Sequence, residues 1–364
     1  MRFYDIKITS AKTGALVTAK SLQNSGLSGS TFTSFANGRT IPGALNIEIN
    51  IPAYNYANPL GGAALRVWGV SLDELSQAND LAGNDIVIRA GMQKGLPLAN
   101  PKQIGVIMQA RIFQAFGNWQ GTSMALDMQF IPPTGEGITP PGNFSFNWKK
   151  GTMLADAIRA TLQVAMPAFT IQMAISDRLV STVAKPGVYG SLSAFSKMIE
   201  DVSKSKQYQG ITTKSGAPYT GVKITISGKN VIVQDGTKDL SSGQFSQSNP
   251  KVIEFQDLIG QPTWYSPSQI NFKVVMRGDL SVSQFVKLPD LSTPFVLTAP
   301  GAGIPGNAST NKSAFKGIFE ITGLHHMGNF RQADANAWIT SVNAVFNNSS
   351  NDLAKQLAQG VIPP

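Results

Sequence analysis

The sequence predicts a mainly β protein with an α+β part in its middle. In the first and last thirds of its 364 residues, apolar and polar side chains alternate, as they do in half-buried strands. In the middle third, apolar residues recur at helical spacing. Turn-forming residues separate the three parts at 132–142 and 236–250. These boundaries predict domains over 1–145, 146–245 and 246–348, followed by a C-terminal tail over 349–364.

The first third is predicted to consist of strands and one short helix. Ser71 and Glu74 have the spacing of a capping box, which opens a helix through about Asn79, closed by Gly83. The expected strands cover residues 1–8, 45–51, 65–70 and 85–90, and a long hairpin follows over 104–116 and 122–131.

The middle third is predicted to be a compact α+β unit. Thr152 is the expected N-cap of a helix over 153–165, and Ser191 caps a second helix whose apolar face ends at Val202. A strand is expected over 169–175. Residues 222–227 and 230–234 flank Gly228 and Lys229, which suit a two-residue hairpin turn.

The last third returns to alternation. The expected strands cover residues 270–277, 284–288, 315–324 and 337–346, and one face of the final strand carries Trp338, Thr340, Val342, Ala344 and Phe346. Residues 291–313 form a long loop rich in Gly, Pro, Ser and Asn. A short helix over 351–359 is expected in the tail.

Two hairpins repeat the same pattern. Gly117-Asn118-Trp119 and Gly328-Asn329-Phe330 each follow a strand that begins with Gly and Val or Ile, and each precedes an alternating strand. Gly-Asn suits a strand-end turn, where positive φ comes easily. The agreement in order favours an internal duplication over coincidence. Asn118, Trp119, Asn329 and Phe330 are the candidate interaction residues.

The residues that carry chemistry are scarce. The chain has no cysteine, which excludes disulfides, thiolate metal sites and cysteine nucleophiles. Its two histidines, His325 and His326, are neighbours in a strand, so they point to opposite faces and cannot chelate one metal as a pair. We expect one buried and one exposed histidine. Residues 301–306 match the spelling of a dinucleotide fingerprint, but no helix follows, so a plain loop is favoured.

No catalytic constellation is present. There is no nucleophile elbow and no phosphate-binding loop, and the capping role explains Glu74 in the pair Asp73-Glu74. We therefore expect no enzymatic activity, no metal and no cofactor. No apolar run is long enough for a transmembrane helix, and the alternating first residues do not suit a signal peptide. Synthesis in the cytoplasm without membrane insertion is expected.

The chain has few charged residues, and its net charge is positive. Charged residues make up 14% of the chain, the formal net charge is +9, and the densest basic groups are at Lys149-Lys150 and Lys204-Ser205-Lys206. Such a low charge content predicts large faces that meet other protein instead of water.

Four stretches resemble the baseplate hub proteins of contractile-tailed bacteriophages. They are residues 67–75 (VWGVSLDEL), 91–99 (GMQKGLPLA), 257–264 (DLIGQPTW) and 323–330 (GLHHMGNF). The resemblance spans about residues 1–346. It implies two related tube-type β-barrel domains that flank the smaller α+β domain, in a homotrimer with pseudo-sixfold symmetry.

The resemblance also implies a place and partners. The place is the tail baseplate of a virion, as a tail tube adapter, and the chain would be made in the host cytoplasm. The partners are a tail tube or tube-initiator protein, the central spike, baseplate wedge proteins and a tape measure protein, with genomic DNA present only in transit during DNA ejection. The family has no catalytic residues.

Two other functions stay open. One is a surface-binding adhesin module of a tail or injection machine, and the other is a cell-wall hydrolase. For the hub, a channel that passes DNA needs a weakly charged lining, because clustered Lys and Arg would hold phosphates. Lys149, Lys150, Lys204 and Lys206 are therefore expected in the middle domain, away from the channel.

Overall fold

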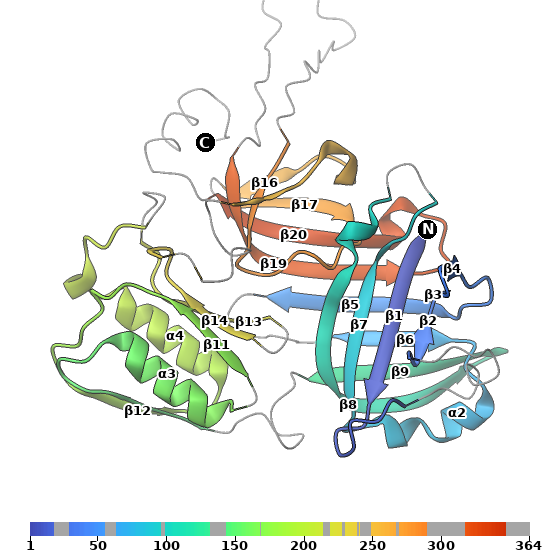
Figure 1. Ribbon diagram of the computed structural model, residues 1–364, viewed down its shortest axis with the longest axis horizontal. Coiled ribbons are helices and arrows are strands. Elements are labelled where there is room, and N and C mark those ends of the chain that lie inside the picture. Colours follow the sequence, from blue (N-terminus) through green and yellow to red (C-terminus); the bar gives the residue numbers. More distant parts are fainter. Residues whose placement is uncertain are drawn as a thin grey trace, which may run out of the picture.

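The protein is mainly β, as the alternating pattern predicts, and a smaller α+β unit lies beside one large sheet (Figure 1). The computed structural model describes residues 1–17, 29–54, 63–95, 99–131, 143–167, 169–213, 219–227, 230–238, 240, 249–266, 269–289 and 317–346. The predicted loop at 291–313, the turn residues 228–229, the helix at 351–359 and the tail at 349–364 lie outside these residues.

One 13-stranded sheet contains strands from both β-rich parts of the chain. Its main path, in order of pairing, is β16 (Thr263–Ser266), β17 (Gln269–Val275), β20 (Trp338–Phe346), β19 (Ile318–Asn329), β5 (Asn46–Tyr54), β6 (Ala64–Trp68), β9 (Ser123–Ile131), β8 (Gly105–Gln120), β7 (Asp85–Met92), β1 (Arg2–Thr9) and β2 (Phe32–Thr33). Off this path, β18 (Phe285–Lys287) pairs with β19 and with β15 (Lys251–Val252).

The two β-rich parts share one strand order. The first part runs β5-β6-β9-β8-β7-β1, and the second runs β16-β17-β20-β19-β18-β15, with the strands in corresponding chain order. Every pair is antiparallel except β15 with β18, which is parallel where β1 with β7 is antiparallel. The common order agrees with the duplication that the repeated hairpin predicts.

A direct junction joins the two parts into one sheet. The second half of β19 pairs with β5, from Gly323 opposite Tyr54 to Asn329 opposite Glu48. The first three residues of β19, Ile318 to Glu320, pair with β18. Strand β19 therefore has β18 and then β5 along one edge, while β20 pairs with its other edge.

Alternation explains which face of the sheet is buried. Ile47, Ile49 and Ile51 of β5 are buried in one apolar cluster, while the residues between them turn to the other face. The predicted apolar face of β20 is confirmed, because all its residues from Trp338 to Phe346 on that face are buried.

The short helix begins where the sequence predicts. Ser71 Oγ accepts a hydrogen bond from the Glu74 amide at 3.4 Å, and the Glu74 carboxylate accepts one from the Ser71 amide at 3.1 Å. The helix α2 (Leu72–Ser76) is shorter than predicted and continues as the 3-10 turn η1 (Ala78–Leu81). The remaining short elements here are β3 (Phe35–Ala36), β4 (Arg39–Thr40), η2 (Pro101–Gln103), η5 (Phe255–Asp257) and η6 (Ala335–Ala337).

The middle unit has its own core. Its elements are β10 (Phe144–Trp148), α3 (Leu154–Ala165), β11 (Thr170–Ala174), β12 (Lys185–Tyr189), α4 (Leu192–Ser203), η3 (Lys206–Tyr208), β13 (Lys223–Ser227) and β14 (Asn230–Gln234). Strand β14 lies between β11 and β13, and β10 pairs with β12. Phe144 and Phe195 stack in this core with ring centroids 5.6 Å apart. Ser191 caps α4 as predicted, since its side chain accepts from the Ala194 amide at 3.1 Å.

Two local predictions are wrong. Thr152 does not cap α3, because its hydroxyl donates to the Lys149 carbonyl at 2.8 Å and Met153 occupies the N-cap position. Gly117 and Asn118 do not form a turn, because β8 continues through Gln120. Glycine suits position 117 because a larger side chain has little room there: a Cβ would lie 3.1 Å from the Leu75 side chain.

The repeated Gly-Asn pair lies closer to a strand end in the second hairpin. Asn329 is the last residue of β19, which runs five residues beyond the predicted end at Leu324. A Cβ on Gly328 would lie 2.7 Å from the Trp338 ring. Both repeated glycines are therefore explained by close packing, at Leu75 in one hairpin and at Trp338 in the other.

Candidate functional site

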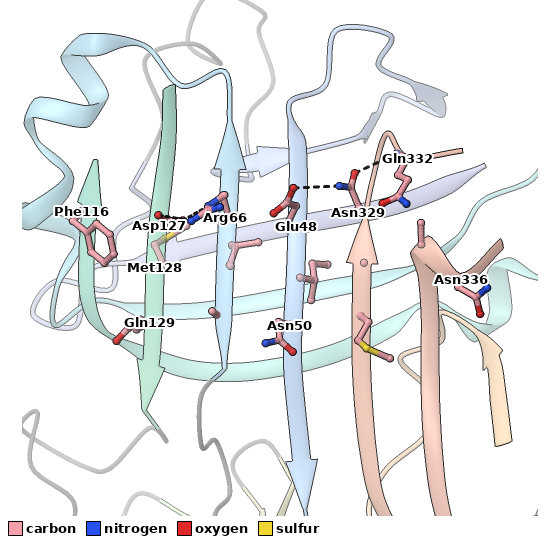
Figure 2. Close-up of a pocket in the computed structure, with 16 residues that line it drawn as sticks. Glu48, Asn50, Arg66, Phe116, Asp127, Met128, Gln129, Asn329, Gln332 and Asn336 are labelled. Atoms are coloured by element: carbon pink, nitrogen blue, oxygen red, sulfur yellow. Dashed lines mark hydrogen bonds and ion pairs between the residues drawn. The ribbon is translucent and has the colours of Figure 1, made fainter. Parts of the chain in front are cut away.

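The candidate site is a hollow, lined by polar and apolar residues, on the face of the main sheet opposite the buried isoleucines of β5, which we call the polar face (Figure 2). It has a volume of about 620 Å³ and extends over β8, β9, β6, β5 and the end of β19. The polar residues that line it are Glu48, Asn50, Arg66, Asp127, Gln129, Asn329, Gln332 and Asn336.

The strand period places these polar groups on one face. Ile47, Ile49 and Ile51 point into the core, so Glu48 and Asn50 point to the opposite side. Arg66 lies between buried Leu65 and Val67 in the same way. The alternation at 45–51 therefore carries a signal for the site as well as for the strand.

A charged pair joins β6 and β9 at the centre of the hollow. Arg66 donates to Asp127 through Nε at 2.5 Å and through Nη2 at 3.0 Å, and Asn118 Nδ2 donates to the same carboxylate at 3.1 Å. Burial opposes ionisation of Asp127, but these hydrogen bonds outweigh it and lower the pKa of the carboxyl. The negative charge is thus neutralised by a partner within the face.

Polar contacts also cross the junction between β5 and β19. Asn329 Nδ2 donates to Glu48 Oε1 at 3.2 Å, and His325 Nε2 lies 2.6 Å from Asn50 Oδ1. Further along the same sheet, Asn271 of β17 donates to Asn343 of β20 at 2.7 Å. The described residues of this face are therefore amides and charges of both signs, and neither sign is concentrated among them.

The four candidate interaction residues lie in different surroundings. Asn118 and Asn329 belong to the polar face, but β5, β6 and β9 separate their strands. Phe330 is half-buried and packs edge-on against Tyr4, with ring centroids 4.9 Å apart. Trp119 is 69% exposed, and its ring nitrogen donates to the Gly121 carbonyl at 2.7 Å. The structure therefore does not bring the four into one cluster.

The histidines follow the prediction. His326 is buried, and its Nδ1 lies 2.9 Å from Thr340 Oγ1, while half-buried His325 points to the polar face. Burial, together with the neighbouring His325, lowers the pKa of His326 to about 3, so the imidazole is neutral near pH 7. Among the residues that the structure describes, no group of three or more His, Asp or Glu could hold a metal ion.

Among the described residues of the polar face, the carboxylate of Asp127 is hydrogen-bonded to Arg66 and is not poised to take a proton at neutral pH. In the part of the chain that the structure describes, no helix has the length and apolar character needed to cross a membrane.

Comparisons with known proteins find likenesses only among solved structures. No family model matches the sequence, and no curated protein matches it. The 43 kDa tail protein of prophage MuSo2 from Shewanella oneidensis is similar at a TM-score of 0.47 and 7% identity, over 94% of this chain and 96% of that one.

Two further structures are similar to a comparable degree. The E. coli c3393 protein, a component of the type VI secretion system, has a TM-score of 0.45 and 7% identity, over 84% of this chain and 74% of that one. A tail protein from Neisseria meningitidis MC58 has a TM-score of 0.43 and 10% identity, over 94% of this chain and 96% of that one. Identities and scores this low assign no function to the chain.

Proposed function

We propose that this chain is a structural, non-enzymatic protein of a phage-type tail. In this proposal it is a homotrimeric baseplate hub that joins a hexameric tail tube to a trimeric central spike. The polar face of its main sheet lines part of the channel for DNA. The observation that carries the proposal is the strand order shared by the two halves of the main sheet.

Symmetry explains why a shared strand order matters. An interface repeats wherever its symmetry operator does, so a threefold ring matches a sixfold tube only if each chain offers two similar surfaces. Two units with one strand order supply such surfaces, and the β19–β5 junction already holds them side by side in one sheet.

The sheet leaves the equivalents of that junction open. Strand β8 pairs with β7 only as far as Arg111, and beyond Ile112 its only partner among the described strands is β9. Strand β16, the counterpart of β5, likewise has only β17 as a partner among them. Pairing of β8 in one copy with β16 in the next would repeat the β19–β5 junction and continue the sheet around a ring.

The composition of the exposed face suits a channel wall. Amides and internally paired charges, such as Arg66 with Asp127, do not present the row of free cations that holds DNA phosphates. The exposed residues Lys149, Lys150, Lys204 and Lys206 all belong to the middle unit and not to the main sheet. We place them away from the channel, where they can meet acidic neighbours.

The partners proposed for this ring are those that the resemblance to baseplate hub proteins implies. The tube end of the ring would receive a tail tube or tube-initiator protein, with a tape measure protein inside it, and the other end would receive the central spike. Baseplate wedge proteins would contact the outer surface. The low content of charged residues, 14% of the chain, suits a protein with so many protein neighbours.

Native mass measurement of the full-length chain tests the proposal. Three copies per particle, with a ring in electron micrographs, is the expected result. A stable monomer at micromolar concentration would overturn the hub and favour an adhesin module. Clearing of cell-wall material by the purified chain would overturn the non-enzymatic assignment and favour a hydrolase.

A further inference from the structure

We infer that Trp119 of one copy docks on the surface formed by Val252 and Phe255 of the next copy. This inference rests on the proposed ring and names the side chains that would close it. We call Val252 and Phe255 the acceptor surface. The β19–β5 junction is filled within the chain, whereas its counterpart, at β8 and β16, is open among the described strands.

The filled junction shows how a hairpin end is held. Phe330 packs against Tyr4 of β1 and against Trp338, and its amide donates to the Ile47 carbonyl of β5 at 2.9 Å. The Arg2 guanidinium of β1 donates to the carbonyls of Asn329, at 2.7 Å, and Phe330, at 3.2 Å. The aromatic residue after Gly328-Asn329 is therefore fixed on β1 and β5 of the other half of the sheet.

The open junction has the same aromatic position without that support. Trp119 follows Gly117-Asn118 as Phe330 follows Gly328-Asn329, yet it is 69% exposed. Phe113 and Phe116 are also exposed on this stretch of β8, which has only β9 beside it among the described strands. Phe116 lines the hollow of the polar face, whereas Trp119, three residues further along the strand, points to the opposite face. A largely exposed tryptophan beside an unpaired strand edge is typical of an interface.

The strand order indicates where the acceptor surface lies. In the second half of the sheet, β15 takes the place of β1 and β16 takes the place of β5. Val252 of β15 is 51% exposed, and Phe255, three residues later in η5, is 69% exposed. Exposed apolar side chains thus occur on both sides of the open junction, at the places that correspond to Phe330 and to the β1 region.

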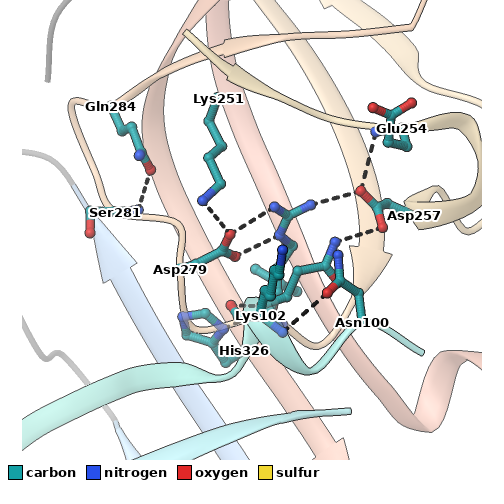
Figure 3. A network of polar contacts seen from close by, with 12 residues as sticks. Asn100, Lys102, Lys251, Glu254, Asp257, Asp279, Ser281, Gln284 and His326 are labelled. Carbon is teal, nitrogen blue, oxygen red and sulfur yellow. Dashed lines mark hydrogen bonds and ion pairs between the residues drawn. The ribbon is translucent and has the colours of Figure 1, made fainter. Parts of the chain in front are cut away.

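A buried ionic network fixes the turn that presents Phe255 (Figure 3). Asp257, at the end of η5, accepts from Arg277 Nη1 at 2.9 Å and from Gln103 Nε2 at 2.7 Å. Arg277 also holds Asp279 through two hydrogen bonds, and Lys251 of β15 lies 2.7 Å from that carboxylate. Phe255 is therefore exposed on a rigid support, which lowers the entropic cost of binding.

The occupant is a second copy of this chain. The two surfaces differ, so their contact is head-to-tail and generates a ring when the rotation closes. Both surfaces lie on every copy, and the strand order of the filled junction is available at the open one. No partner of another kind is needed to account for both sets of exposed side chains.

Cross-linking tests the contact, because the chain has no cysteine of its own. The variants Trp119→Cys and Phe255→Cys are produced together in full-length chains with different tags and treated with a short bis-maleimide linker. The expected product is a cross-linked pair that carries both tags, formed only when the two variants are combined. The matched control replaces Trp119→Cys by Val164→Cys, since Val164 of α3 is exposed but lies in the middle unit.

A dilution series gives a second readout. The trimer of Trp119→Ser should dissociate at a concentration at least tenfold higher than the wild-type trimer does. The trimer of Val164→Ser should dissociate at the same concentration as the wild type. A wild-type trimer without the Trp119–Phe255 cross-link, or one that Trp119→Ser does not weaken, overturns this inference and leaves the hub intact. A wild-type monomer overturns the proposed function itself.

Discussion

Gly105 and Gly278 lie in backbone-to-backbone contact. A Cβ on Gly105 would be 2.2 Å from the Gly278 carbonyl oxygen, and a Cβ on Gly278 would be 2.4 Å from the Gly105 backbone. Gly105 begins β8 in the first half of the sheet, and Gly278 follows β17 in the second. Glycine is required at both positions because no side chain fits between the two backbones.

The first prediction concerns this contact. Gly278→Ala should lower the free energy of unfolding by about 2 kcal/mol, because the new methyl group forces the two backbones apart. Gly190→Ala is the control, since a Cβ there meets nothing within 4 Å and should change stability by less than about 0.5 kcal/mol. Denaturant titration of both variants measures the difference, and equal stability would contradict the close contact.

The second prediction concerns the buried guanidinium. Arg277→Met leaves Asp257 buried without its cation and should cost about 3–5 kcal/mol in unfolding free energy. The control is Lys238→Met, which removes a half-exposed pair with Asp177 and should cost less than about 1 kcal/mol. Similar losses in the two variants, measured by denaturant titration, would show that the network does not stabilise the fold.

Much of the fold could be predicted from sequence because its signals are local. Alternation located the long strands, and the capping box at Ser71 and Glu74 located α2. The repeated hairpin indicated a duplication, and the strand pairings agree with it. The N-cap prediction at Thr152 is wrong because a hydroxyl before a helix can also donate to a nearby carbonyl, here that of Lys149.

The candidate site was harder to predict because it depends on register between distant strands. Arg66 and Asp127 are 61 residues apart in sequence and meet only when β6 pairs with β9. The same holds for Asp257 and Gln103, which are 154 residues apart. The sequence pattern places each residue on a face of its own strand but does not say which strand lies beside it.

The third prediction concerns pH. Burial lowers the pKa of His326 to about 3, below its ordinary value of about 6.5, so the unfolded chain takes up a proton there before the folded one does. The free energy of unfolding should therefore fall as the pH is lowered below 6.5, by about 1.4 kcal/mol per pH unit from this group.

His326→Gln isolates that contribution. Between pH 6 and pH 5, above the range in which ordinary carboxylates titrate, the variant should show a flatter dependence of stability on pH than the wild type. His325→Gln is the control and should keep most of the slope, since His325 is only half-buried. An unchanged slope in His326→Gln would show that His326 titrates normally in the folded protein.

The last prediction concerns the polar face as a channel lining. Gln129 and Gln332 are exposed residues of the hollow on β9 and after β19, so Gln129→Lys with Gln332→Lys adds free cations to that face. If the face lines a channel, these lysines surround DNA and neutralise phosphates. The slope of log binding constant against log salt should then steepen by about 2, at about 0.9 for each phosphate contact.

The control, Val164→Lys with Val188→Lys, adds the same charge to exposed positions of the middle unit. Binding of a short duplex, measured by fluorescence anisotropy across a salt series, separates the two sites. An equal gain in both variants would mean that only net charge matters and that the polar face does not enclose DNA.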